Sequence, residues 1–319
     1  MKRGLIFGDE RIKIARNCVK NKGGAMMRES KIEKSSRRRF MHSMAALFLC
    51  VPMLVSVLPV SAAQRQDLKN TNILLIGTDH RDDSWNGNSD TMILATIRHD
   101  EQEIMMTSFM RDLYADIPGH GVHKLNYAYA VGGADKLKET LEDNYDLSIN
   151  HYAVVDFESM ADIVDIVGGV EITVSDAEVE VLNGYLNSME AQEDYLSCGG
   201  TYIMNGNQAV AYARIRFVGN NDYQRTQRQR DILKEIFAKV QDLDGEQLIA
   251  LAEEVVSDVE NDYNPLEMLA LLQQLPEMKN YDLEEERIPY DGMFYSQNEM
   301  LVPDFESTIE KLHEAIGVQ

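Results

Sequence analysis

Three short apolar runs follow one another closely between residues 72 and 108, and they constrain the fold more than any other feature of the sequence. The runs are Asn72–Gly77 (NILLIG), Thr91–Arg98 (TMILATIR) and Glu103–Ser108 (EIMMTS). Short apolar stretches bounded by turn residues are typical of buried strands. Only the turn-like His99–Gln102 separates the second run from the third, which predicts an antiparallel hairpin. If the first run also pairs antiparallel with the second, all three share one sheet.

This arrangement brings charged residues to one rim of the predicted sheet. Asp79 follows the first strand, Asp90 precedes the second, and Arg111 comes three residues after the third. Neighbouring carboxylates repel each other unless they share a proton or a cation. With Arg111 and Arg81 nearby, the two aspartates suit a complex of Mg²⁺ with phosphate, because carboxylates bind hard cations and arginine grips phosphate. The competing interpretation makes both aspartates turn and strand-cap residues, and both arginines surface ion-pair partners.

A second charged cluster follows in the C-terminal half. The segment Arg214–Arg230 holds five arginines and a single acid, Asp222. In an extended segment, Arg214 and Arg216 would point to the same face. Asp222 is placed to cap the following helix, on which Arg225 and Gln229 share one face. Such a reversal of charge within an acidic domain predicts an anion site. The competing interpretation is a solvated helix that offsets acidic neighbours.

Two expectations concern side chains around these clusters. Arg228 and Arg230 lie on the same helix as Arg225, and we expect them to be exposed and to tolerate lysine. Residues 157–167 form a predicted helix with a broad apolar face, which core packing explains better than a lipid pocket. That face consists of Phe157, Met160, Ile163, Val164 and Val167.

The N-terminal part of the chain carries the opposite charge from the rest. Residues 1–39 hold 13 basic and 4 acidic side chains, whereas the other 280 residues hold 18 and 49. The uncharged segment Met44–Val60 follows shortly after three consecutive arginines, and its seventeen residues would span about 25 Å as a helix. Basic residues before an apolar span predict a cytoplasmic N-terminus.

We therefore expect a basic cytoplasmic segment (1–39), a transmembrane signal-anchor (40–63) and one extracytoplasmic domain (64–319). The protein would then be a single-pass protein of the cell membrane, with the membrane itself as a partner. A cleaved signal peptide remains the alternative, because Ser61–Ala63 resembles a signal-peptidase site.

Composition limits the class of the large domain. Hydrophobic residues make up 44% of the chain and charged residues 26%, which excludes a mostly disordered protein. The net charge of −22 argues against nucleic acid as a partner, because binding to phosphates needs a basic surface. Strands interspersed with helices predict an α/β (α+β) sandwich, in which helices flank a central mixed, partly antiparallel sheet.

Seven motifs in this order resemble the LytR–CpsA–Psr family of cell-wall glycopolymer ligases, from about Thr71 to the C-terminus. They are Leu75–Asp79, Ser89–Met92, Ser108–Asp112, Lys124–Tyr129, Val167–Val170, Ala211–Arg216 and Asp222–Arg230. Two positions depart from the family pattern. Asn88 stands where the family often has arginine, so Arg81 would have to compensate, and Met110 stands where the family often has proline.

The resemblance implies an Mg²⁺-dependent phosphotransferase. Such an enzyme moves a teichoic acid- or capsule-like glycopolymer from a polyprenyl-pyrophosphate carrier to a hydroxyl of peptidoglycan. By position, the resemblance makes Asp79 and Asp90 the metal-associated acids, and it makes these two with Arg111 and Arg214 the catalytic set. The implied substrate-binding residues are Arg81, Lys124, Arg214, Arg216, Asp222, Arg225 and Gln229. The alternative is a non-enzymatic, membrane-anchored regulator, or a protein that binds the wall or polyprenyl phosphate through the same anion site.

Overall fold

The computed structural model of the chain describes residues 70–78, 87–219, 221–244, 247, 250–251, 259–274 and 277–318. These residues belong to one compact unit that runs from Leu68 to Gln319. The expected signal-anchor (40–63) and the basic segment before it lie outside the described residues, as do Asp79 and Arg81. Among the helices that the structure describes, none combines the length and the apolar character needed to cross a bilayer.

Among the described residues, five strands come first, helices and strands are then interspersed, and three strands precede the last helix. The strands are β1 (Asn70–Thr78), β2 (Ser89–Arg98), β3 (Glu103–Phe109), β4 (Tyr114–Ile117), β5 (Gly121–Lys124), β6 (His151–Val155), β7 (Val170–Val174), β8 (Gly200–Met204), β9 (Glu260–Asn261), β10 (Asp282–Ile288), β11 (Phe294–Gln297) and β12 (Met300–Pro303). The α-helices are α4 (Asn126–Tyr145), α5 (Phe157–Ile166), α6 (Asp176–Ser188), α7 (Gly206–Ala213), α8 (Asn221–Val240), α10 (Pro265–Gln274) and α11 (Phe305–Ile316), with short 3-10 turns at Gln192–Asp194 and Glu277–Asn280.

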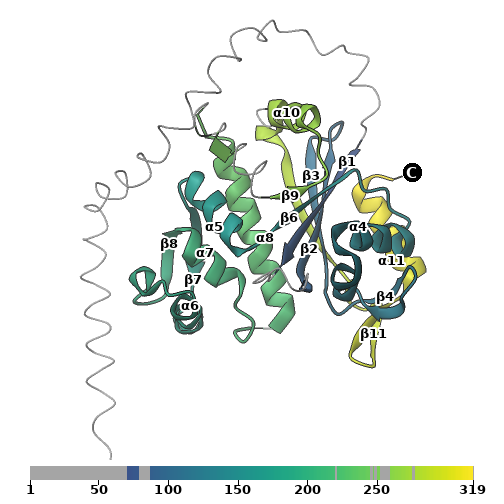
Figure 1. The fold of residues 1–319 in the computed structure, drawn as a ribbon, viewed down its shortest axis with the longest axis horizontal. Helices are drawn as coiled ribbons and strands as arrows, with labels where there is room; N and C mark the ends of the chain where they lie inside the picture. The colour runs from purple at the N-terminus through teal and green to yellow at the C-terminus, as the bar shows by residue number, and fades with distance from the viewer. Residues whose placement is uncertain are drawn as a thin grey trace, which may run out of the picture. The chain divides into compact units, whose positions relative to one another are not determined.

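A mixed sheet of six strands, in the order β10-β3-β2-β1-β6-β9, forms the centre of the unit (Figure 1). The pairs β1–β2 and β2–β3 are antiparallel, as the spacing of the three apolar runs predicted. β6 joins β1 in parallel, and β10 joins β3 in parallel across a long separation in sequence. The predicted mixed, partly antiparallel sheet flanked by helices is confirmed.

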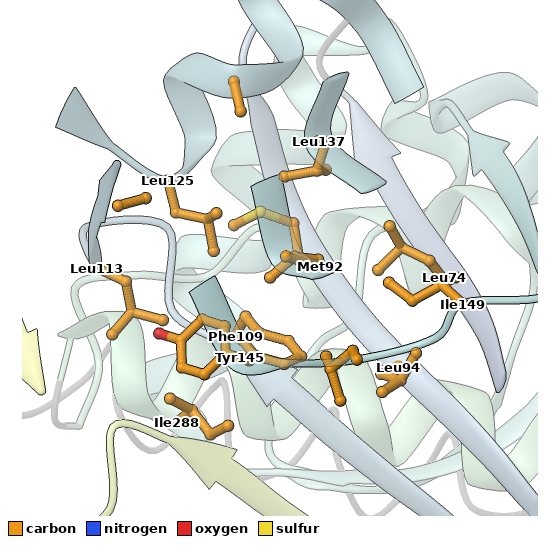
Figure 2. Close-up of a cluster of buried hydrophobic side chains, with 14 of the residues drawn as sticks. Leu74, Met92, Leu94, Phe109, Leu113, Leu125, Leu137, Tyr145, Ile149 and Ile288 are labelled. Atoms are coloured by element: carbon orange, nitrogen blue, oxygen red, sulfur yellow. The ribbon is translucent and has the colours of Figure 1, made fainter. Parts of the chain in front are cut away.

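Side chains of the central strands alternate between the two faces of the sheet. Leu74 and Met92 belong to a buried cluster that also contains Leu137 of α4 and Leu312 of α11. Figure 2 shows this cluster, in which the Phe109 ring meets the Tyr145 ring edge-on at 5.2 Å. The helices α4 and α11 therefore cover one face, while α5, α7 and α8 lie on the other side (Figure 1).

A second core joins α5, α6, α7 and the β7–β8 hairpin to α8. The helices α5, α6 and α7 each begin with a capping box, in which two side chains satisfy backbone N–H groups at the helix start. The capping pairs are Asp156 with Ser159, Ser175 with Glu178, and Asn205 with Gln208. These local signals fix where each helix starts, and so they fix the loops between the helices.

Arg228 is fully buried, at 1% exposure, which corrects the expectation that it is exposed. Its guanidinium donates to the Glu178 carboxylate at 2.8 and 3.1 Å, and to the carbonyls of Ile215 and Val218 at 3.0 and 2.9 Å. Burial would raise the pKa of Glu178, but hydrogen bonds from Ser175 and Arg228 hold that pKa below its ordinary value. Arg228 thus ties the loop after α7 to α6 and α8.

Arg230 is also buried, at 5% exposure, so the expectation fails for it as well. Its guanidinium donates to Glu285 of β10 at 3.0 Å, to the Ser108 hydroxyl of β3 at 2.7 Å and to the Gln227 side chain at 2.6 Å. Two arginines of α8 are therefore paired with different elements, Arg228 with Glu178 of α6 and Arg230 with Glu285 of β10. Helical spacing alone did not show this, because Glu178 and Glu285 come from distant parts of the chain.

We predict that Arg228→Lys lowers the free energy of unfolding by roughly 2–4 kcal/mol, because one ammonium cannot replace a guanidinium that holds four buried contacts. Urea unfolding of the full chain measures this change. The matched control is Arg287→Lys, whose partner Asp291 is 91% exposed, and we expect it to cost about 0–1 kcal/mol. Equal stability of the two variants would contradict a structural role for Arg228.

Candidate functional site

Asp90 occupies an irregular position at the rim of the sheet. Gly77 pairs with Thr91 and Thr78 pairs with Ser89, so Asp90 between them has no opposite residue in β1. Such a bulge turns a side chain out of the regular alternation and is frequent beside active sites. The close approach needs a glycine, because a Cβ on Gly77 would lie 2.8 Å from the Thr91 side chain.

Arg111 reaches this rim from the end of β3, as the predicted topology required. Its Nη1 donates to Asp90 Oδ1 at 2.7 Å, and its Nη2 lies 3.5 Å from Asp222 Oδ2. Burial lowers the pKa of Arg111, but the hydrogen bond to Asp90 and the charges of Asp90, Asp222 and Asp112 outweigh it, so the pKa lies above its ordinary value. The prediction that Asp90 and Arg111 meet is confirmed.

Asp222 is the second carboxylate of the cluster. It lies in the first turn of α8, and its carboxylate contacts Arg216, with Nε at 3.0 Å and Nη2 at 3.1 Å. Arg225 Nη2 lies 3.4 Å from the same group. The side chain predicted as a helix cap therefore serves as the common partner of three arginines, 111, 216 and 225.

Arg225 is buried at 3% exposure, and with Arg111 and Arg216 it shares the two carboxylates of Asp90 and Asp222. Its Nη1 lies 3.7 Å from Asp90 Oδ2, and its Nη2 donates to the Asp90 carbonyl at 3.3 Å. Burial, with help from the charges of Arg111 and Arg216, lowers its pKa below the ordinary value despite Asp90 and Asp222. Its Nε and the Gln229 Oε1 have no hydrogen-bond partner among the described residues. An anion would supply the acceptor that Arg225 Nε lacks, whereas Gln229 Oε1, itself an acceptor, needs a donor such as a hydroxyl group.

Arg214 does not lie in an extended segment, as the sequence analysis assumed, but at the C-terminal cap of α7. Its guanidinium packs over the Phe157 ring at 4.6 Å and over the Tyr185 ring at 4.9 Å. Arg214 and Arg216 nevertheless line the same cavity as Arg225 and Gln229, so the predicted arginine cluster is brought together. Tyr185 of α6 was missed, because no motif of the sequence marks it.

A cavity of about 440 Å³ extends from this cluster along the face of the sheet opposite α4. Ile73, Leu75 and Ile93 of the sheet line it, and α5, α7 and α8 supply the facing apolar wall. From Thr78 at the charged end to Ile73, five strand residues cover about 17 Å. At the Ile73 end, Tyr263 stacks on His151 with ring centroids 3.9 Å apart. The cavity is thus an apolar channel with a cationic mouth.

This channel corrects the expected role of the apolar face of α5. Phe157, Met160 and Ile163 line the cavity, whereas Val164 and Val167 are buried. Sequence periodicity does not distinguish these two roles, because a buried core and an apolar cavity wall require the same residue types.

The remaining predicted residues lie around the mouth or outside the described part of the chain. Lys124 Nζ lies 2.9 Å from the Asp112 carboxylate and does not line the channel. The predicted roles of Asp79 and Arg81 fall outside the described residues. Met110, one of the two departures, donates its backbone N–H to Ile288 of β10 at 3.0 Å, a bond that proline could not make.

The described residues contain no group of three or more side chains of the kinds that hold a metal. Mg²⁺, however, is commonly bound by one or two carboxylates together with substrate phosphates and water. Asp90 fits this requirement, because its side chain is 38% exposed and no described residue hydrogen-bonds its Oδ2. Asp79, the second expected ligand, follows directly after Thr78 in the sequence.

Comparison with known proteins gives a family and two informative relatives. A model of the LytR_cpsA_psr family matches residues 25–315. The polyisoprenyl-teichoic acid–peptidoglycan teichoic acid transferase TagU of Enterococcus faecalis is 32% identical over 235 residues, which cover 71% of this chain and 74% of TagU. Biofilm regulatory protein A of Streptococcus mutans is 30% identical over 250 residues, or 72% of this chain and 60% of that protein.

Among solved structures, Bacillus subtilis TagT with bound octaprenyl pyrophosphate lipid has a TM-score of 0.59 and 24% identity. The superposition covers 79% of this chain and 92% of TagT. That likeness supports the fold. The family model spans most of the chain, and the transferase relative exceeds 30% identity over more than two thirds of it, so the protein belongs to the LytR_cpsA_psr (LytR–CpsA–Psr) family.

Proposed function

We propose that this protein is a phosphotransferase that moves a glycopolymer from a polyprenyl-pyrophosphate carrier to a hydroxyl of peptidoglycan. One observation carries the proposal: Arg214, Arg216 and Arg225 line one end of an apolar channel, and Arg111 pairs there with Asp90, which also lines it. The name of the Enterococcus relative and the lipid bound by TagT agree with this chemistry. The glycopolymer is of the teichoic acid or capsule type.

The channel and its mouth match the two parts of such a donor. An isoprenoid tail gains about 25 cal/mol for each Å² of apolar surface that the channel removes from water. The pyrophosphate then lies at the mouth, where guanidinium groups offer paired N–H donors to phosphate oxygens. Arg111 would bind it from the end of β3, Arg225 from α8, and Arg214 and Arg216 from the end of α7 and the loop that follows.

The reaction exchanges one phosphorus–oxygen bond for another. The acceptor hydroxyl oxygen forms a bond to the phosphorus that carries the sugar, and the bond from that phosphorus to the bridging oxygen breaks. Polyprenyl phosphate leaves with the electron pair, and the hydroxyl proton passes to a base or to solvent. Charge builds up on phosphoryl oxygens, so fixed guanidinium groups at this position lower the barrier.

Asp90, with Asp79, is the proposed holder of Mg²⁺ at the mouth. When bound, the ion neutralises phosphate oxygens and so improves the leaving group. Residues 40–63 are the proposed membrane anchor, with residues 64–319 outside the cell, where peptidoglycan is found. A regulator that binds the same lipid without turnover is the alternative, which the name of the Streptococcus relative favours.

We predict that Arg111→Lys, Arg214→Lys and Arg225→Lys each lower the transfer rate by about 10- to 1000-fold, because lysine cannot make the paired contacts of a guanidinium. The measurement is transfer from a fixed pyrophosphate-lipid donor to peptidoglycan by variants that melt like the parent. Arg98→Lys is the matched control, because Arg98 pairs with Glu101 and Glu103 at the end of β2 opposite to Asp90, and it should keep the parental rate. Full activity of all three variants would exclude this cluster as the active site, and absence of turnover by the parent would favour the regulator.

We predict that Asp90→Ala and Asp79→Ala reduce transfer and raise the Mg²⁺ concentration needed for half-maximal rate, because each removes one carboxylate ligand. Titrating the rate with Mg²⁺ tests this for the parent and the variants. The control is Asp291→Ala, because Asp291 is an exposed aspartate in the turn that follows β10. Parental Mg²⁺ dependence in both aspartate variants would show that these acids are structural.

We predict that Ala153→Phe, which places a ring in the channel, raises the donor KM by about 10-fold for a long isoprenoid tail. Loss of burial for two methylene groups accounts for this magnitude. A donor with a short tail is the internal control, since it should remain a substrate of near-parental KM. Equal KM changes for both donors would mean that the tail does not occupy the channel.

A further inference from the structure

An exposed aromatic pair lies on the side of the mouth that the channel does not occupy. His123 of β5 and Tyr127 in the first turn of α4 stack with ring centroids 4.5 Å apart at 38°. The Tyr127 side chain is 39% exposed, and the neighbouring Val122 is 44% exposed. Two mutually packed rings that face solvent, tilted against each other, form an apolar surface with polar edges. We call His123 and Tyr127 the ring platform.

The platform is joined directly to Arg111. The Asn126 backbone N–H, one residue before Tyr127, donates to the Arg111 carbonyl at 3.2 Å. Lys124, one residue after His123, lies 2.9 Å from Asp112, and Asp112 follows Arg111 in the chain. The buried Leu113 and Leu125 anchor this region in the core, where Figure 2 shows them on neighbouring segments. The platform therefore has a fixed position relative to the backbone of Arg111 and to Asp112.

The two faces of the sheet separate the platform from the donor channel. The channel lies on the face covered by α5, α7 and α8, whereas β4 and the start of α4 pack with the cluster on the opposite face, and β5 pairs with β4 (Figure 1). In phosphoryl transfer the attacking and leaving oxygens lie roughly in line with the phosphorus. A lipid phosphate that leaves toward the channel requires an acceptor that approaches from the other side, where the platform stands.

We propose that His123 and Tyr127 bind the acceptor, a sugar ring of a peptidoglycan glycan strand, and so determine acceptor specificity. This inference rests on the proposed transfer reaction. A hexose ring has one apolar face of C–H groups that stacks on aromatic rings, while its hydroxyls remain free at the edges. Lys124, at 36% side-chain exposure, follows His123 in the chain and pairs with Asp112, so we expect it to meet a polar substituent of that sugar.

Steady-state kinetics of the full chain in detergent tests the proposal, with a pyrophosphate-lipid donor and soluble peptidoglycan oligomers as acceptor. Tyr127→Ala and His123→Ala should each raise the acceptor KM about 3- to 10-fold, the range expected for loss of one ring contact. The donor KM and the hydrolysis of the donor by water should stay unchanged. Tyr127→Phe, which keeps the ring, should retain the parental KM.

Tyr195→Ala is the matched control, because Tyr195 is 45% exposed and its hydroxyl donates to Asn187 near the end of α6, not to the segment that carries Arg111. Sedimentation with insoluble peptidoglycan, which needs no turnover, provides a second readout and should show weaker binding for the Tyr127→Ala, His123→Ala double variant. If that loss appears while the parent transfers no glycopolymer, the transfer reaction is refuted and the platform stands. A parental acceptor KM and parental sedimentation in the double variant would refute the platform. Loss of binding to anionic lipid vesicles, with peptidoglycan binding intact, would also refute it.

Discussion

The unequal charge balance between two carboxylates and their arginines is the interaction on which the rest of the site depends. Asp90 and Asp222 contact Arg111, Arg216 and Arg225 at N···O distances of 2.7 to 3.7 Å. Without these acids the guanidinium groups would repel each other at the mouth of an apolar channel. With them, a surplus of positive charge remains, and it is fixed in place before any anion binds.

The preorganised mouth depends on a second, fully structural set of charges. Arg228 binds Glu178 and the carbonyls of Ile215 and Val218, which fixes the loop that carries Arg216. Arg230 binds Glu285 and Ser108, which holds α8 against β3 and β10. Thus one helix supplies both a ligand-facing arginine and the two arginines that position its surroundings. A rigid support of this kind is what electrostatic stabilisation of a transition state requires.

The sheet separates the two proposed substrates by the simplest property of a strand, the alternation of its side chains. Residues such as Leu74 and Met92 pack on α4 and α11, while Ile73 and Ile93 line the channel on the other face. Only at the rim is alternation broken, because the bulge at Asp90 brings its carboxylate to Arg111. The mouth therefore lies where donor and acceptor can approach from opposite faces.

The sequence by itself determined the three central strands, their antiparallel order and the meeting of Asp90 with Arg111, because short spacing leaves few ways to connect neighbouring strands. It also determined the family, through motifs in a fixed order. Only the tertiary structure decided which arginines of α8 face the channel and which are buried, since their partners Glu178 and Glu285 lie about fifty residues away on either side. The same holds for the channel itself. An apolar side chain carries no mark of whether its neighbour is another side chain or a cavity, and that depends on how far apart the packed elements stand.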